Sequence, residues 1–198
     1  MRAAGLRPGR RGTHGWSDDR KGAVANDDAG RSLLWPGVLV GVGIAGSLDQ
    51  IVLHQLLRWH HFYDRGSDAA GLIADGIFHL GSIVVLVAGL VPLIRRWQAG
   101  PAPRRWALGG VLLGAGGFNL YDGVVQHKLL GLHQVRAGAP DNLPYDVAFI
   151  GVAAAVLLVG LLLLRAGGHA SASGASASAP VSGGRHGRSK RNTRNASP

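Results

Sequence analysis

The chain has 198 residues, of which 46% are hydrophobic and 16% charged, with a formal net charge of +10 and no cysteine. The absence of cysteine excludes disulfides and thiolate metal sites. The positive charge is concentrated in tails and between apolar segments, and no aromatic residues interleave with the basic C-terminal tail, so we expect no nucleic-acid partner.

The chain opens and closes with polar segments. Residues 1–32 are polar and basic, and residues 166–198 consist mainly of Ala, Ser and Gly with Arg and Lys. Such compositions bury too little apolar surface to offset the entropy of the chain. We therefore predict two disordered basic tails around a central domain at residues 33–165.

Four apolar segments make up this central domain. Each is close to the about 20 residues that a helix needs to cross a bilayer, and helix is the default because a backbone in lipid must satisfy its own hydrogen bonds. The sequence predicts an all-α integral membrane protein, a four-helix bundle, with helices at about 33–59, 70–94, 106–132 and 145–164.

The distribution of basic residues predicts the orientation. Lys and Arg crowd both tails and the loop between the second and third helices, whereas the other two loops carry few. By the positive-inside rule, both termini and the second loop are cytoplasmic. The first and third loops then face outward.

An internal repeat relates the first and third helices. Asp49, His54 and His60 match Asp122, His127 and His133 at one constant offset. Several glycines, valines and leucines around them match at the same offset, as do Arg31 and Arg104. The bundle is therefore predicted to consist of two repeated helical hairpins.

The repeated aspartates continue stripes of small residues. Gly37 and Gly41 precede Asp49 at helical spacing, and Gly110 and Gly114 precede Asp122. Small residues let helices approach closely, so the stripes either close the bundle or mediate a homo-oligomer. On an α-helix, His60 lies about 20° around from Asp49, but His54 is rotated by about 140°. We therefore expect His54 on a different face from Asp49.

Histidines and aspartates from three helices are expected at one level near the outer surface. Ionisable groups at this depth are costly and indicate function. Imidazole with carboxylate suits zinc, copper(II), iron or manganese, whereas copper(I) prefers sulfur ligands. The candidate metal ligands are Asp49, His54, His60, His61, Asp75, His79, Asp122, His127 and His133. Alternatively, His54 and His127 could be the axial ligands of a haem b.

Other interpretations stay open. Asp and His pairs can simply hold helices together, which would make the protein a scaffold. Asp49, Asp75 and Asp122 could instead pass protons or ions outward, although no polar ladder continues into the cytoplasmic half. Nothing identifies a nucleophile or a substrate pocket, so enzymatic activity is left open and a binding site is favoured.

Three sequence segments resemble a family of bacterial membrane proteins with four predicted helices, classified as a domain of unknown function. They are GSLDQIVLHQLLRWHH (46–61), DGIFH (75–79) and FNLYDGVVQHKLLGLHQVR (118–136). The chain departs from the family pattern at Gln126, Lys128 and Gln134. The resemblance implies the bacterial cytoplasmic membrane, and partners among respiratory-oxidase or copper-handling membrane proteins.

Overall fold

The computed structural model describes residues 22, 25, 27–100 and 102–176, with side chains described up to residue 166. The prediction of an all-α fold is confirmed, since no strand occurs in these ranges. The elements are α2 (Leu34–Asp49), the π-helix η1 (Gln50–Leu56), α3 (Asp68–Gln98), α4 (Arg104–Tyr121), the π-helix η2 (Asp122–Leu129) and α5 (Leu143–Ser176).

Within the described residues, four helices are long and apolar enough to cross a membrane, as predicted. They span Asp27–Leu56, Asp68–Gln98, Arg104–Leu129 and Leu143–Ala166. The first and third end a few residues before their predicted limits, because the chain leaves the helix before His60 and His133.

The limits of the tails differ from prediction where the structure describes them. Residues 27–31 are helical and continue toward α2, and α5 extends to Ser176. The remainder of the two predicted disordered tails lies outside the described residues.

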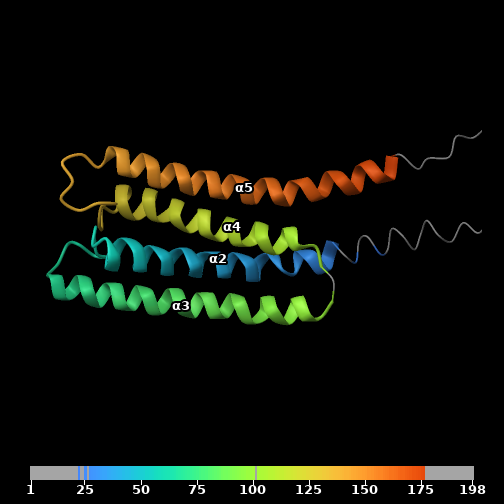
Figure 1. The fold of residues 1–198 in the computed structure, drawn as a ribbon, viewed down its shortest axis with the longest axis horizontal. Helices are drawn as coiled ribbons and strands as arrows, with labels where there is room; N and C mark the ends of the chain where they lie inside the picture. The colour runs from blue at the N-terminus through green and yellow to red at the C-terminus, as the bar shows by residue number, and fades with distance from the viewer. Residues whose placement is uncertain (1–21, 23–24, 26, 101, 177–198) are drawn as a thin grey trace, which may run out of the picture.

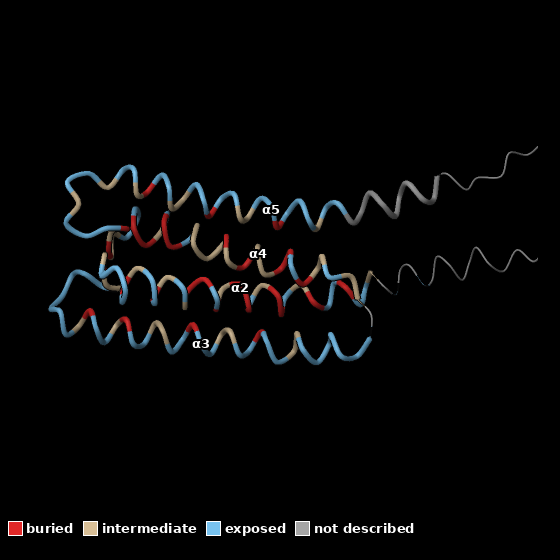
Figure 2. Tube along the Cα trace, viewed as in Figure 1, coloured by how far each residue is buried: buried red, intermediate tan, exposed pale blue. Residues whose placement is uncertain are grey.

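The helices are arranged in the order α3, α2, α4, α5 (Figure 1). α2 and α4 pack against each other in the centre, α3 covers the outer side of α2, and α5 covers the outer side of α4. Buried positions are concentrated on the central pair, while most of α3 and α5 is exposed (Figure 2). Because their exposed side chains are largely apolar, these two helices present the lipid-facing surface.

The glycine stripes bring the backbones of α2 and α4 into contact. A Cβ atom added at Gly37 would lie 2.6 Å from the Ala107 carbonyl oxygen, and one at Gly110 would lie 3.2 Å from Gly37 Cα. Gly41 and Gly114 face backbone atoms of the opposite helix in the same way. Of the two predicted uses of the stripes, the structure shows packing inside one chain, so these positions are not available to a second copy.

Both hairpin loops lie at one end of the molecule, and the α3–α4 connection lies at the other end (Figure 1). The predicted site residues lie at or near the end with the hairpin loops. That the two hairpins are copies of one unit stays a prediction.

We expect Gly114→Ala to lower the thermal stability of the detergent-solubilised protein. The new methyl group would lie 2.9 Å from the Val38 carbonyl carbon, and overpacking of this kind costs about 1–3 kcal/mol. Gly81→Ala is the matched control, because Gly81 lies on α3 with nothing within 4 Å of its Cβ position. Tryptophan fluorescence during heating measures both midpoints. Equal midpoints would contradict the close α2–α4 contact.

Candidate metal centre

The two central helices change to π-helical geometry where the site residues begin. In η1 the Leu57 N–H donates to the Val52 carbonyl at 2.9 Å, and in η2 the Leu130 N–H donates to the Val125 carbonyl at 2.8 Å. These bonds join residues five apart instead of four. π-Helical turns are rare and frequently occur at functional sites.

The π-helical turns place each aspartate beside the histidine five residues later. Asp49 Oδ2 lies 3.2 Å from His54 Nε2, and Asp122 Oδ2 lies 3.0 Å from His127 Nε2. The prediction that His54 lies on a different face from Asp49 was therefore wrong. It assumed α-helical rotation, whereas the wider π-turn brings residues five apart to one side.

A residue in the left-handed conformation lies two positions after the end of each π-helix. Arg58 has φ 51° and Gly131 has φ 56°, and the chain then turns back over the end of the central pair. His60 and His133 consequently lie in loops and not on helical faces as predicted. They reach the site because the loops return them to it.

The two loops hold each other's histidine. The His60 Nδ1–H donates to the Val135 carbonyl at 2.9 Å, and the His133 Nδ1–H donates to the Phe62 carbonyl at 3.0 Å. A carbonyl oxygen only accepts, so these bonds require the proton on Nδ1 in both neutral rings. In each ring the Nε2 atom then carries a lone pair.

Further hydrogen bonds between the loops fix their position. The Asp64 N–H donates to the Leu132 carbonyl at 3.2 Å, and the Ala137 N–H donates to the Trp59 carbonyl at 2.7 Å. Arg65 adds two side-chain hydrogen bonds of 2.8 Å to the carbonyls of Leu130 and Gly131 at the end of η2. These hydrogen bonds hold the two loops together without a bound ligand.

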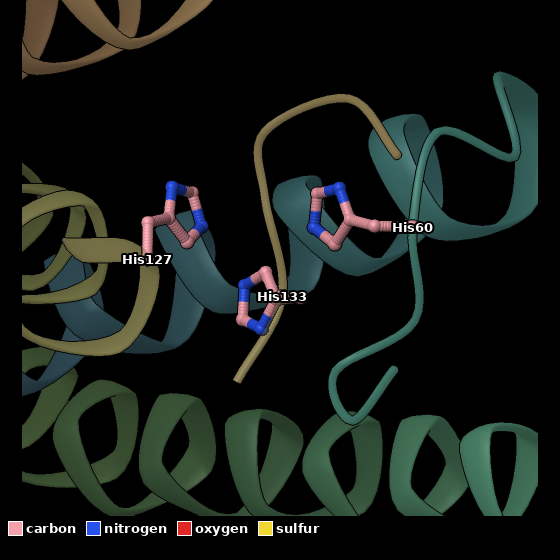
Figure 3. Close-up of side chains that lie close together, drawn as sticks. All are labelled: His60, His127 and His133. Carbon is pink, nitrogen blue, oxygen red and sulfur yellow. The ribbon is translucent and has the colours of Figure 1, made fainter. Parts of the chain in front are cut away.

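Three histidine rings from both halves of the chain meet inside this frame (Figure 3). The ring centroids of His60 and His133 are 4.6 Å apart, and those of His127 and His133 are 4.4 Å apart. His60, His127 and His133 are 3%, 1% and 3% exposed. Their Nε2 atoms have no hydrogen-bond partner among the residues that the structure describes.

Asp122 lies against two of these rings. Its Oδ2 is 3.0 Å from His127 Nε2, and its Oδ1 is 3.7 Å from His133 Nε2. The first contact is within ion-pair distance, although His127 Nε2 has no hydrogen-bond partner in the described structure. The Asp122 carboxylate and the Nε2 atoms of His127 and His133 therefore lie close together.

His54 lies next to this group and between two carboxylates. Its ring centroid is 4.3 Å from that of His60, and its Nδ1 is 2.8 Å from Asp75 Oδ1. Asp75 also accepts from His61 Nδ1 at 2.7 Å and from the Phe62 backbone N–H at 2.7 Å. Because both its oxygens are already engaged, Asp75 orients His54 and His61 and is not positioned as a ligand itself.

The second half lacks this orienting carboxylate. His127 Nδ1 has no hydrogen-bond partner in the described part of the chain, and the nearby acid Asp146 on α5 is paired with Lys128. Phe149 packs beside the His127 ring with centroids 5.4 Å apart. Lys128 is one of the departures from the family pattern noted in the sequence. Its ion pair with Asp146 engages that carboxylate.

Three of the predicted ligands, Asp75, His61 and His79, lie outside the two groups of described side chains that could share an ion. The His61 side chain is 34% exposed and bonded to Asp75. His79 belongs to neither of the two groups of side chains that could share an ion, which are His60, His127 and His133, and Asp49, His54 and His60. The sequence analysis included His79 because of its expected depth in the membrane. Residues at the same depth need not contact one another.

Gln50 is a site residue that the sequence analysis did not single out. It is completely buried at 0% exposure, and neither its amide nitrogen nor its amide oxygen has a hydrogen-bond partner in the described structure. Together with His54 and His60 it lines a cavity of about 670 Å³ between η1, the first loop and the start of α3. A glutamine inside an apolar run was the available signal.

The two loop histidines are neutral at pH 7. Burial, together with the neighbouring His54 and His133 rings, lowers the pKa of His60 to about 3. Burial is also the largest cause that lowers the pKa of His133 to about 4, against the opposing effect of Asp122. Neutral imidazole is the form that binds metal ions.

Residues 36–167 match the family model described as "Predicted membrane protein (DUF2243)". The chain belongs to this family. The match confirms the resemblance to a membrane-protein domain of unknown function and covers the four membrane-spanning helices. No curated protein and no solved structure matches the chain. For this member of the DUF2243 family, the geometry of the site is therefore the basis for a functional proposal.

We expect Asp75→Asn to lower the thermal midpoint, because an amide cannot accept from His54, His61 and the Phe62 N–H together. Loss of hydrogen bonds to a buried charged group costs about 1.5–3 kcal/mol. Asp68→Asn is the control, since Asp68 is exposed at the start of α3. If both variants unfold at the wild-type temperature, Asp75 does not hold the site together.

Proposed function

We propose that this protein binds a divalent transition-metal ion at the hairpin-loop end of its membrane domain. The observation that carries the proposal is the convergence of three buried Nε2 atoms, of His60, His127 and His133, without hydrogen-bond partners in the described structure. A buried polar atom that lacks a partner costs about 1–3 kcal/mol. A metal ion would remove this cost for all three atoms.

The distances around Asp122 suit a common ion. Ligand atoms about 2.1 Å from one ion lie about 3.0 Å apart at a right angle and about 3.4 Å apart at the tetrahedral angle. The Asp122 oxygens lie 3.0 Å from His127 Nε2 and 3.7 Å from His133 Nε2. Small side-chain adjustments would therefore complete a coordination shell.

The surrounding bonds provide the support that metal-binding histidines usually have. Ligating imidazoles typically donate their second ring nitrogen to a carbonyl or a carboxylate, which fixes tautomer and ring orientation. His60 and His133 do so through Val135 and Phe62, and His54 does so through Asp75. This pattern supports a metal site that is prepared by the protein fold.

The donor set limits the identity of the ion. Imidazole and carboxylate suit zinc, copper(II) and iron, and the chain has no cysteine and a single methionine to offer copper(I). Haem b is less well supported. His54 has a carboxylate at each ring nitrogen, and the His60 and His133 rings, 4.3 Å and 6.2 Å from it, occupy space that a porphyrin would need.

A purely structural role explains less of the site. Histidine–aspartate pairs that hold helices together should satisfy their hydrogen bonds, as His54 and Asp75 do. The Nε2 atoms of His60, His127 and His133 gain nothing from such a role. A proton relay uses the same residues, but the inner halves of the spanning helices offer no polar continuation.

Membrane orientation is part of the proposal. Arg95 and Arg96 at the end of α3 and Arg104 and Arg105 at the start of α4 lie at the end of the molecule opposite the site, so the positive-inside rule directs the site outward and both termini into the cytoplasm. We infer a location in the bacterial cytoplasmic membrane. Respiratory-oxidase or copper-handling proteins remain the expected partners.

Metal analysis of protein purified in detergent tests the proposal. We expect stoichiometric zinc, copper or iron after reconstitution of chelator-treated protein. His127→Ala and His133→Ala should lose at least tenfold in affinity, because even the loss of a residue that only orients a ligand typically costs about 10–100-fold. Isothermal titration with each metal measures the affinities.

His79→Ala is the matched control, because it removes a histidine of the same membrane layer that belongs to neither ligand group. It should bind metal like the wild type. A wild-type protein that takes up no ion, or histidine variants that bind as tightly as the control, would overturn the proposal.

A further inference from the structure

We infer that the site holds two metal ions, each bound by one aspartate and two histidines from one hairpin. The first set is Asp49, His54 and His60, and the second is Asp122, His127 and His133. This inference rests on the proposed metal-binding function and specifies its stoichiometry. It follows from the way the candidate ligands divide into two groups that share His60.

The first set brings together three side chains that one cation could hold. His54 Nδ1 is bonded to Asp75 Oδ1 at 2.8 Å, and on the other side of the ring Nε2 lies 3.2 Å from Asp49 Oδ2. In a neutral ring with the proton on Nδ1, Nε2 carries a lone pair. The other Asp49 oxygen, Oδ1, and His60 Nε2 have no hydrogen-bond partner in the described structure. One cation would satisfy all three side chains.

The number of ions depends on which ligand group His60 belongs to. It is a member of both candidate ligand groups, but its Nδ1 is bonded to Val135, so only its Nε2 can bind a metal. If His60 serves the group with His127 and His133, the Asp49 and His54 pair is left incomplete. Asp122 lies close enough to His127 and His133 to take the place of His60 there. Two complete sets then result.

Each set is the combination of two histidines and one carboxylate. This donor set occurs at non-haem iron sites and leaves coordination positions open. The distance from the aspartate Oδ2 to the nearer histidine Nε2 is similar in the two sets. It is 3.2 Å in the first and 3.0 Å in the second. Both arise from a π-helical turn followed by a loop histidine.

The cavity beside the first set supplies an entry path and room for further ligands. It has a volume of about 670 Å³ and is lined by His54, His60 and Gln50. The Gln50 amide nitrogen and oxygen are buried and have no hydrogen-bond partner in the described structure. A water that reached them could satisfy them, because buried waters typically bridge such groups.

The test uses the full-length protein in detergent, stripped with a chelator and loaded with copper(II). Elemental analysis should give two ions per chain in the wild type. Ions in two-metal sites are about 3.5–4 Å apart, so the spins of two copper(II) ions should couple. The electron paramagnetic resonance signal of the protein should then be much weaker than that of two isolated ions.

Asp49→Asn should reduce the copper content to one ion per chain and restore the electron paramagnetic resonance signal of an isolated copper(II) ion. Asp122→Asn should do the same for the other set. His79→Ala is the control and should keep two coupled ions. If a variant fails to fold, as judged by its elution in gel filtration, the wild-type stoichiometry and spin coupling decide the question.

One uncoupled ion in the wild type would overturn the inference and leave the proposed function intact. The same holds if Asp49→Asn binds as much copper as the wild type, which is the result expected if His54 is doubly protonated between its two carboxylates. No bound copper in any form would instead contradict the proposed function itself.

Discussion

The site is dominated by one electrostatic constraint: imidazole and carboxylate groups converge inside an apolar domain, and the Nε2 atoms of three buried histidines have no hydrogen-bond partner in the described structure. The loop carbonyls and Asp75 hold the Nδ1 protons of His60, His133 and His54 on the outside of the cluster. The Nε2 lone pairs are thereby directed inward. Because unpartnered buried polar groups and buried carboxylates are costly, a cation at their centre is the most direct way to stabilise the arrangement.

The fold provides two means of building this cluster. Glycines bring α2 and α4 into backbone contact, so that side chains at the ends of these two helices meet. The π-helical turns then place each aspartate beside the histidine five residues later, and a left-handed residue turns the chain back toward the bundle. α3 contributes the orienting carboxylate, and α5 contributes packing through Phe149. The two outer helices otherwise face lipid.

The sequence predicted the four spanning helices, because apolar length is a strong signal. It also singled out all the residues of the two groups that could hold an ion, because ionisable groups in membranes are costly. It did not predict how the residues meet. The π-helical turns overturned the face assigned to His54, and the positions of His60 and His133 depend on loop bonds to Val135 and Phe62. No periodicity reveals such bonds. His79 shows the converse, since a suitable residue at the right depth does not join either ligand group.

X-ray absorption at the metal edge of the reconstituted protein tests the central claim most directly, because it reports the atoms bound to the ion. The account predicts nitrogen and oxygen ligands at about 2.0–2.2 Å, with the outer-shell scattering that imidazole rings produce. A shell of oxygen atoms without imidazole scattering would show that the converging Nε2 atoms do not bind the ion, and would contradict the account.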